Sequence, residues 1–67
     1  MKMQINGKET ELPAAIASVQ DVLDHYNLDS QAVVVERNEQ IVPRENLSSV
    51  KAENGDRLEI VEFVGGG

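Results

Sequence analysis

The chain has 67 residues, no cysteine and one histidine, and its 12 acidic residues against 6 basic ones give a formal net charge of −6. A domain of this length buries only about 60% of the surface of its unfolded chain, so a deep, many-layered active site is not expected. The absence of cysteine excludes stabilisation by disulfides or zinc–thiolate sites. The acidic balance, with one Tyr and one Phe, argues against a nucleic-acid partner, which would select clustered cations and stacking aromatic rings.

Uninterrupted apolar runs such as residues 32–35 are far shorter than the roughly 18 residues that span a membrane. No signal-peptide pattern is visible. A chain without cysteine is typical of a reducing compartment. We therefore expect a cytoplasmic protein with no membrane contact.

The first predicted elements form a hairpin. Apolar and polar residues alternate over residues 1–5, which is the period of a half-buried strand. Asn6-Gly7 suits the positive φ angles of a tight turn, and residues 8–12 then form the returning strand. Pro13 ends this strand because it has no N–H to donate.

One helix is predicted after the hairpin. Ser18 and Asp21 have the spacing of a capping box. Asn27 can adopt the left-handed conformation that ends a helix, and Leu28 could then fold back onto Leu23. Four apolar residues share the spacing of one helical face: Val19, Val22, Leu23 and Tyr26.

The second half of the chain predicts three strands. Residues 33–37 begin with three β-branched valines, and residues 40–42 follow a two-residue turn. A short helical turn is expected over residues 45–47, and a turn at 54–56 precedes the strongest strand, residues 57–64.

The order β-β-α-β-β-β predicts an α+β roll, in which a mixed sheet packs on one helix through a right-handed crossover. Six residues are expected beneath the helix: Met3, Ile5, Val33, Val35, Leu58 and Ile60.

No catalytic or metal-binding constellation emerges. His25 has no partner imidazole or thiolate for a metal and is expected to face water, as are Asp21 and Asp24. A Ser18–His25–Asp21 triad is rejected, because Ser18 serves better as a helix cap and nothing buries the orienting acid.

The C-terminal residues differ in composition from the rest of the chain. Residues 1–64 are expected to form the domain, and Gly65, Gly66 and Gly67 a flexible tail of about 10 Å at ~3.3–3.6 Å per residue. A tail without side chains could enter a narrow tunnel in another protein and carry the α-carboxylate of Gly67 at its tip. A frayed end or a cloning remnant is the alternative.

The whole chain resembles the ThiS family of ubiquitin-like sulfur carriers in thiamine thiazole biosynthesis. The segment Asn38 to Glu45 (Asn-Glu-Gln-Ile-Val-Pro-Arg-Glu) is the most specific part of the match, and Gly65 adds a third glycine to the usual two. The other matching segments are residues 3–8, 33–38 and 54–64 with the terminal glycines. The resemblance implies a β-grasp (ubiquitin-like) fold.

The resemblance also implies a carrier rather than an enzyme, with no bound cofactor or metal. A ThiF-type adenylating enzyme would use ATP to convert the Gly67 carboxylate to an acyl-adenylate, with Gly65 and Gly66 threaded into the partner's site. Sulfur supplied by a cysteine desulfurase would then make a thiocarboxylate, which a ThiG-type thiazole synthase would consume.

A partner interface is predicted on the last strand. If Leu58 and Ile60 point to the core, then Val61 and Phe63 lie on the uncovered face of the sheet, beside Val34. A bulge near Val61 that turns Phe63 inward is the alternative.

Three other functions share much of this pattern. A carrier for molybdopterin or cysteine synthesis would use Gly67 in the same way. A protein modifier joined to lysines would share the tail. A ubiquitin-like interaction module would need no covalent chemistry and should tolerate a C-terminal tag.

Overall fold

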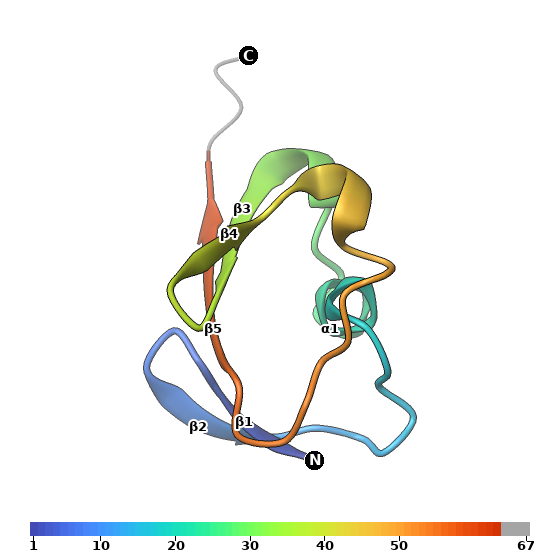
Figure 1. The fold of residues 1–67 in the computed structure, drawn as a ribbon, viewed down its shortest axis with the longest axis vertical. Helices are drawn as coiled ribbons and strands as arrows, with labels where there is room; N and C mark the ends of the chain where they lie inside the picture. The colour runs from blue at the N-terminus through green and yellow to red at the C-terminus, as the bar shows by residue number, and fades with distance from the viewer. Residues whose placement is uncertain (64–67) are drawn as a thin grey trace.

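A computed structural model describes residues 1–63 as a five-stranded mixed sheet with one α-helix packed on one face (Figure 1). The strand order is β2-β1-β5-β3-β4, with β1 and β5 parallel and the other neighbours antiparallel. This confirms the predicted α+β roll. The elements are β1 (Lys2–Ile5), β2 (Lys8–Glu11), α1 (Val19–His25), β3 (Val33–Arg37), β4 (Gln40–Val42) and β5 (Arg57–Glu62), with 3-10 turns η1 (Ser30–Ala32) and η2 (Arg44–Asn46).

Two tight hairpins set the register of the outer strands. Asn6 and Gly7 have φ angles of 52° and 81°, and Asn38 and Glu39 have φ angles of 51° and 72°. Positive φ at both central residues is the requirement of the two-residue turns that match strand twist. The first hairpin is confirmed, although β2 ends at Glu11, one residue before the predicted end. The second hairpin and β4 also lie where the sequence predicts them.

The N-terminus of α1 carries the predicted capping box. The Ser18 hydroxyl oxygen accepts a hydrogen bond from the Asp21 N–H at 3.1 Å. The Asp21 carboxylate in turn accepts from the N–H groups of Ala17 (2.9 Å) and Ser18 (3.0 Å). These backbone hydrogen bonds lower the pKa of Asp21. The carboxylate is therefore part of the cap rather than a catalytic group.

The C-terminus of α1 partly corrects the sequence prediction. Asn27 has the expected left-handed conformation, with φ 58°, and the Leu28 N–H donates to the Leu23 carbonyl at 2.9 Å. Tyr26, however, is 40% exposed and does not continue the buried stripe. The helix has only seven residues and Tyr26 is its C-cap, so the chain turns away before this side chain reaches the core.

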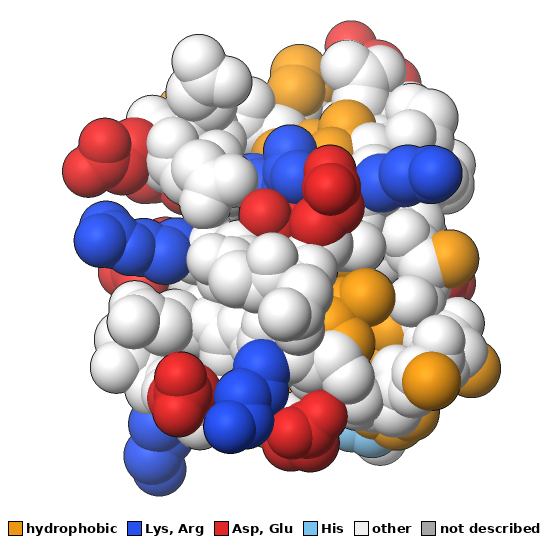
Figure 2. Space-filling model, turned by 60° about the horizontal axis from the view of Figure 1, so that its bottom comes forward, with side chains coloured by type: hydrophobic (Ala, Val, Ile, Leu, Met, Phe, Trp, Pro, Cys, Tyr) orange, Lys and Arg blue, Asp and Glu red, His pale blue; other side chains and the backbone are white. Residues whose placement is uncertain are grey.

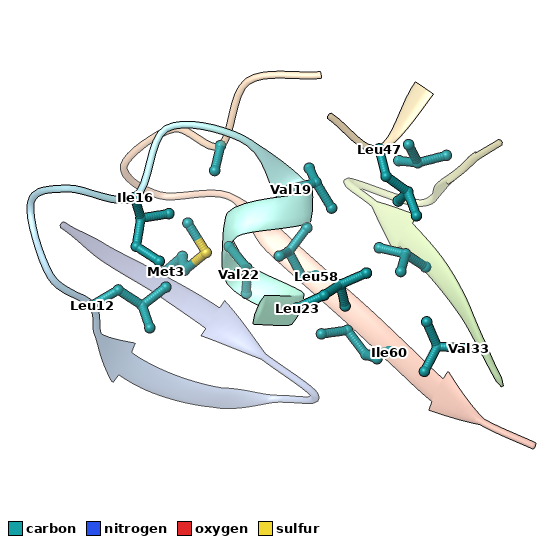
Figure 3. Close-up of a cluster of buried hydrophobic side chains, with 13 residues drawn as sticks. Met3, Leu12, Ile16, Val19, Val22, Leu23, Val33, Leu47, Leu58 and Ile60 are labelled. Atoms are coloured by element: carbon teal, nitrogen blue, oxygen red, sulfur yellow. The ribbon is translucent and has the colours of Figure 1, made fainter. Parts of the chain in front are cut away.

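The core lies between α1 and the inner face of the sheet. Figure 3 shows Val22 and Leu23 of α1 directed toward Leu58 of β5. Five of the six residues expected beneath the helix are buried, whereas Ile5 is only partly buried. The buried hydrophobic residues are Met3, Leu12, Ile16, Val19, Val22, Leu23, Val33, Val35, Val42, Leu47, Ala52, Leu58 and Ile60.

An ion pair holds the start of β5 against the β3–β4 hairpin. Asp56 is 6% exposed and accepts hydrogen bonds from Arg37 Nε at 2.8 Å, Arg37 Nη2 at 3.2 Å, Asn38 Nδ2 at 3.2 Å and the Glu53 N–H at 2.8 Å. Burial alone would raise the pKa of Asp56, but these hydrogen bonds and the guanidinium charge outweigh it and lower the pKa. The contact also raises the pKa of Arg37.

The face shown in Figure 2 carries acidic and basic side chains side by side, with hydrophobic side chains showing mainly between the centre and the right side of the view. No basic stripe of the kind that tracks a phosphate backbone is visible on this face. Within residues 1–63, no helix is long and apolar enough to cross a membrane.

Candidate functional site

The strand that leads toward the C-terminal glycines lies in the middle of the sheet. β5 pairs with β3 in an unbroken antiparallel register from Arg37↔Leu58 to Val33↔Glu62. The Phe63 N–H continues this pairing by donating to the Ala32 carbonyl at 3.0 Å. β5 ends at Glu62, so the predicted strand over residues 57–64 is too long at Phe63, and residue 64 lies outside the described residues. The sheet thus fixes the chain up to Phe63.

Asn6 anchors the other edge of β5. β1 ends at Ile5 and pairs with β5 only as far as Leu58. Beyond that point the Asn6 side chain takes over: its Oδ1 accepts from the Ile60 N–H at 2.7 Å and its Nδ2 donates to the Ile60 carbonyl at 3.2 Å. A turn residue therefore completes the pairing that a longer β1 would provide. Sequence reasoning assigned Asn6 only to the turn.

An apolar patch lies on the face of the sheet opposite α1. Val34 and Val61 are register partners on β3 and β5, and they are 39% and 60% exposed. Phe63 is 43% exposed and follows β5, and Ile41 of β4 is 65% exposed. Val34 and Ile41 line one shallow recess. We call these four residues the apolar patch. Exposed apolar side chains gathered in this way are typical of a protein interaction site.

The structure brings together the residues predicted for the partner interface. The unbroken β3–β5 register excludes the bulge that would have turned Phe63 into the core. Ile41 was missed, although its position can be found from the two-residue turn, which pairs Glu36 with Ile41. Gly65, Gly66 and Gly67 lie outside the described residues, as does the predicted boundary between domain and tail at residue 64.

The other polar candidates have structural explanations. Ser18 and Asp21 hydrogen-bond to each other's backbone in the helix cap, and His25 is exposed at the end of α1. Among residues 1–63, no group of three or more His, Cys, Asp or Glu residues converges closely enough to hold a metal ion.

A mixed five-stranded sheet wrapped around one helix defines a β-grasp domain of the ubiquitin-like class. The structure is similar to the crystal structure of the thiamine biosynthesis protein ThiS from Geobacter metallireducens, with a TM-score of 0.83, 29% identity and full coverage of both chains. The ThiS family model matches residues 2–67. The chain belongs to the ThiS family.

Two further relatives carry functional names. The sulfur carrier protein ThiS of Bacillus subtilis is 40% identical over 65 residues, which cover 97% of this chain and 98% of the relative. A thiazole synthase of Paramagnetospirillum magneticum is 45% identical over all 67 residues of this chain. The chain spans only 20% of the length of that thiazole synthase.

Proposed function

We propose that the protein is a sulfur carrier for the thiazole ring of thiamine, with the α-carboxylate of Gly67 as its working group. An α-carboxyl group has a pKa of about 3.3–3.7, so at neutral pH it is an anion and a poor electrophile. In the proposed reaction a carboxylate oxygen attacks the α-phosphorus of ATP and pyrophosphate leaves. The terminal sulfur of a persulfide on the sulfur donor then attacks the acyl carbon and AMP leaves, which gives an acyl disulfide. Two equivalents of a thiol reduce this disulfide, which releases the thiocarboxylate and the thiol of the donor while the reducing thiols form a disulfide.

The observation that carries this proposal is the family match, which extends over the terminal glycines as well as the folded domain. The relative from Bacillus subtilis that bears the name sulfur carrier protein has almost the same length as this chain. The central position of β5 adds a physical argument, because it gives the glycines a rigid base from which to reach into an enzyme.

The partners follow from the chemistry. Adenylation requires a ThiF-type enzyme that holds ATP, and the sulfur comes from a donor such as a cysteine desulfurase. We propose a ThiG-type thiazole synthase as the acceptor, because two thiazole synthases contain a region similar to this whole chain. In each of those two proteins, the region similar to this chain is part of the same polypeptide as the rest of the thiazole synthase. The chain itself acts as carrier and cosubstrate, and its partners supply the catalysis.

The apolar patch is the proposed docking surface for these enzymes. Val34 and Val61 lie on the strand pair that leads to the C-terminal glycines, and Phe63 follows β5 directly. A partner that covers this patch would bind the body of the carrier while the glycines enter its site. Phe63→Ala should weaken binding to the adenylating enzyme and leave the fold intact.

Growth of a thiazole-requiring strain tests the function. The wild-type gene should restore growth without thiazole, and a variant lacking Gly66 and Gly67 should not. A variant with Ser49→Ala, an exposed position in the segment between β4 and β5, is the matched control and should restore growth. Growth supported by the truncated variant would refute the carrier mechanism. Failure of the wild-type gene would favour an acceptor in molybdopterin or cysteine synthesis, or a non-covalent interaction module.

A further inference from the structure

Two glutamates lie directly opposite each other on the exposed face of the sheet. Glu36 of β3 and Glu59 of β5 are register partners, and their neighbours Val35, Leu58 and Ile60 point into the core. Directly opposed side chains in an antiparallel pair have Cβ atoms about 4.5–5.5 Å apart, and like charges at such positions destabilise the sheet. The fold gains nothing from this arrangement.

The two carboxylates belong to a hollow on that face. A recess of about 380 Å³ is lined by Glu36, Glu39, Glu59 and Arg57, together with Gln4 and Gly7. Three carboxylates against one guanidinium leave an excess of two negative charges. None of the ion pairs formed within residues 1–63 joins Arg57 to these glutamates. The recess therefore remains short of positive charge.

The recess lies next to the apolar patch in the strand register. Glu36 and Glu59 each lie two residues from the Val34–Val61 pair on the same strands, and Glu36 also pairs with Ile41 on β4. A protein that covers the patch would also cover the recess. A metal ion is a poor occupant, since no group of three carboxylates within residues 1–63 converges closely enough to bind one. A long cationic side chain fits both the hollow and its charge.

We propose that the enzyme that docks on the apolar patch inserts a lysine or arginine side chain into the recess between Glu36 and Glu59. This inference rests on the proposed function, and it adds the chemistry that the partner surface must have: an apolar centre with a basic residue beside it. The repulsion between the two glutamates is relieved only in the complex. The pair thus favours partners that carry a cation at this point over those that do not.

Binding of the full chain to the purified adenylating enzyme and thiazole synthase of the same organism tests this proposal. The double variant Glu36→Gln/Glu59→Gln should bind at least one enzyme about tenfold more weakly, and its affinity should depend less on salt. Its melting temperature should be equal to or above that of the wild type, because a repulsion has been removed. The matched control is Asp24→Asn/Glu45→Gln, which changes the net charge equally on α1 and η2 and should bind as the wild type does.

The outcomes separate this inference from the proposed function. If Val61→Ser loses affinity while the glutamate variants bind like the control, the docking face stands and the cation in the recess is refuted. If Val61→Ser also binds normally to both enzymes, the docking face is wrong and the inference falls with it. If the folded wild-type chain binds neither enzyme, both the proposed function and the inference are overturned.

Discussion

Removal of the buried Asp56 carboxylate should destabilise the protein. Asp56→Ala deletes the acceptor of four hydrogen bonds and leaves Arg37, Asn38 and the Glu53 N–H without this partner. Breaking a fully buried pair costs about 3–5 kcal/mol. The Arg37 side chain is 25% exposed and can regain water, so we expect a loss of about 2 kcal/mol in the free energy of unfolding.

For a domain of this size that loss corresponds to a melting temperature about 8–16 °C lower. Urea unfolding followed by circular dichroism measures the free energy, and Asp24→Ala on the exposed face of α1 is the matched control, with an expected change of about 0.5 kcal/mol or less. The reasoning is refuted if Asp56→Ala unfolds within about 0.5 kcal/mol of the wild type. That result would mean that the buried network does not hold β5 in place.

Three further predictions test the pH dependence of Asp56 and two other contacts. The pKa of Asp56 is lowered from its usual 3.8, so the stability that it contributes is present above pH 3.8 and is lost as the pH falls through its folded pKa. Asp56→Asn should accordingly lose less stability than the wild type when the pH is lowered below about pH 4. Parallel curves of unfolding free energy against pH for the two proteins would contradict this. Asn6→Ala should lower the free energy of unfolding, measured with urea, by about 1–3 kcal/mol, because the N–H and carbonyl of Ile60 lose their partners. An unchanged midpoint of urea unfolding would show that water replaces the Asn6 amide without loss of stability. Ser18→Ala should lower the free energy of unfolding by about 1 kcal/mol, because the helix cap is missing. Ser18→Asp should retain most of the stability of the wild type.

The features that the sequence predicted well are those encoded by neighbouring residues. Asn6-Gly7 specifies its turn through φ angles that few other residue pairs adopt, and Ser18 with Asp21 specifies a helix start within four residues. The alternation around Leu58 and Ile60 was enough to place Val61 on the exposed face. Each of these depends on local stereochemistry or on the period of a strand.

The features that the sequence did not predict depend on strand register between distant segments. Two such features appear only when β1, β3 and β5 are aligned: the hydrogen bonds between Asn6 and Ile60, and the pairing of Glu36 with Glu59. Tyr26 fits the helical period, but it is the C-cap of a helix that ends before the left-handed Asn27, and it stays exposed. The role proposed for Gly67 rests on chemistry with a partner, which no packing rule within one chain can determine.

The intact mass of the protein, measured after incubation with ATP, the adenylating enzyme, a cysteine desulfurase and cysteine, tests the central claim most directly. The account predicts a mass gain equal to replacement of one oxygen by sulfur, located at Gly67 by fragmentation and absent when ATP is omitted. An unchanged mass with active enzymes, or sulfur attached at any other residue, would contradict it.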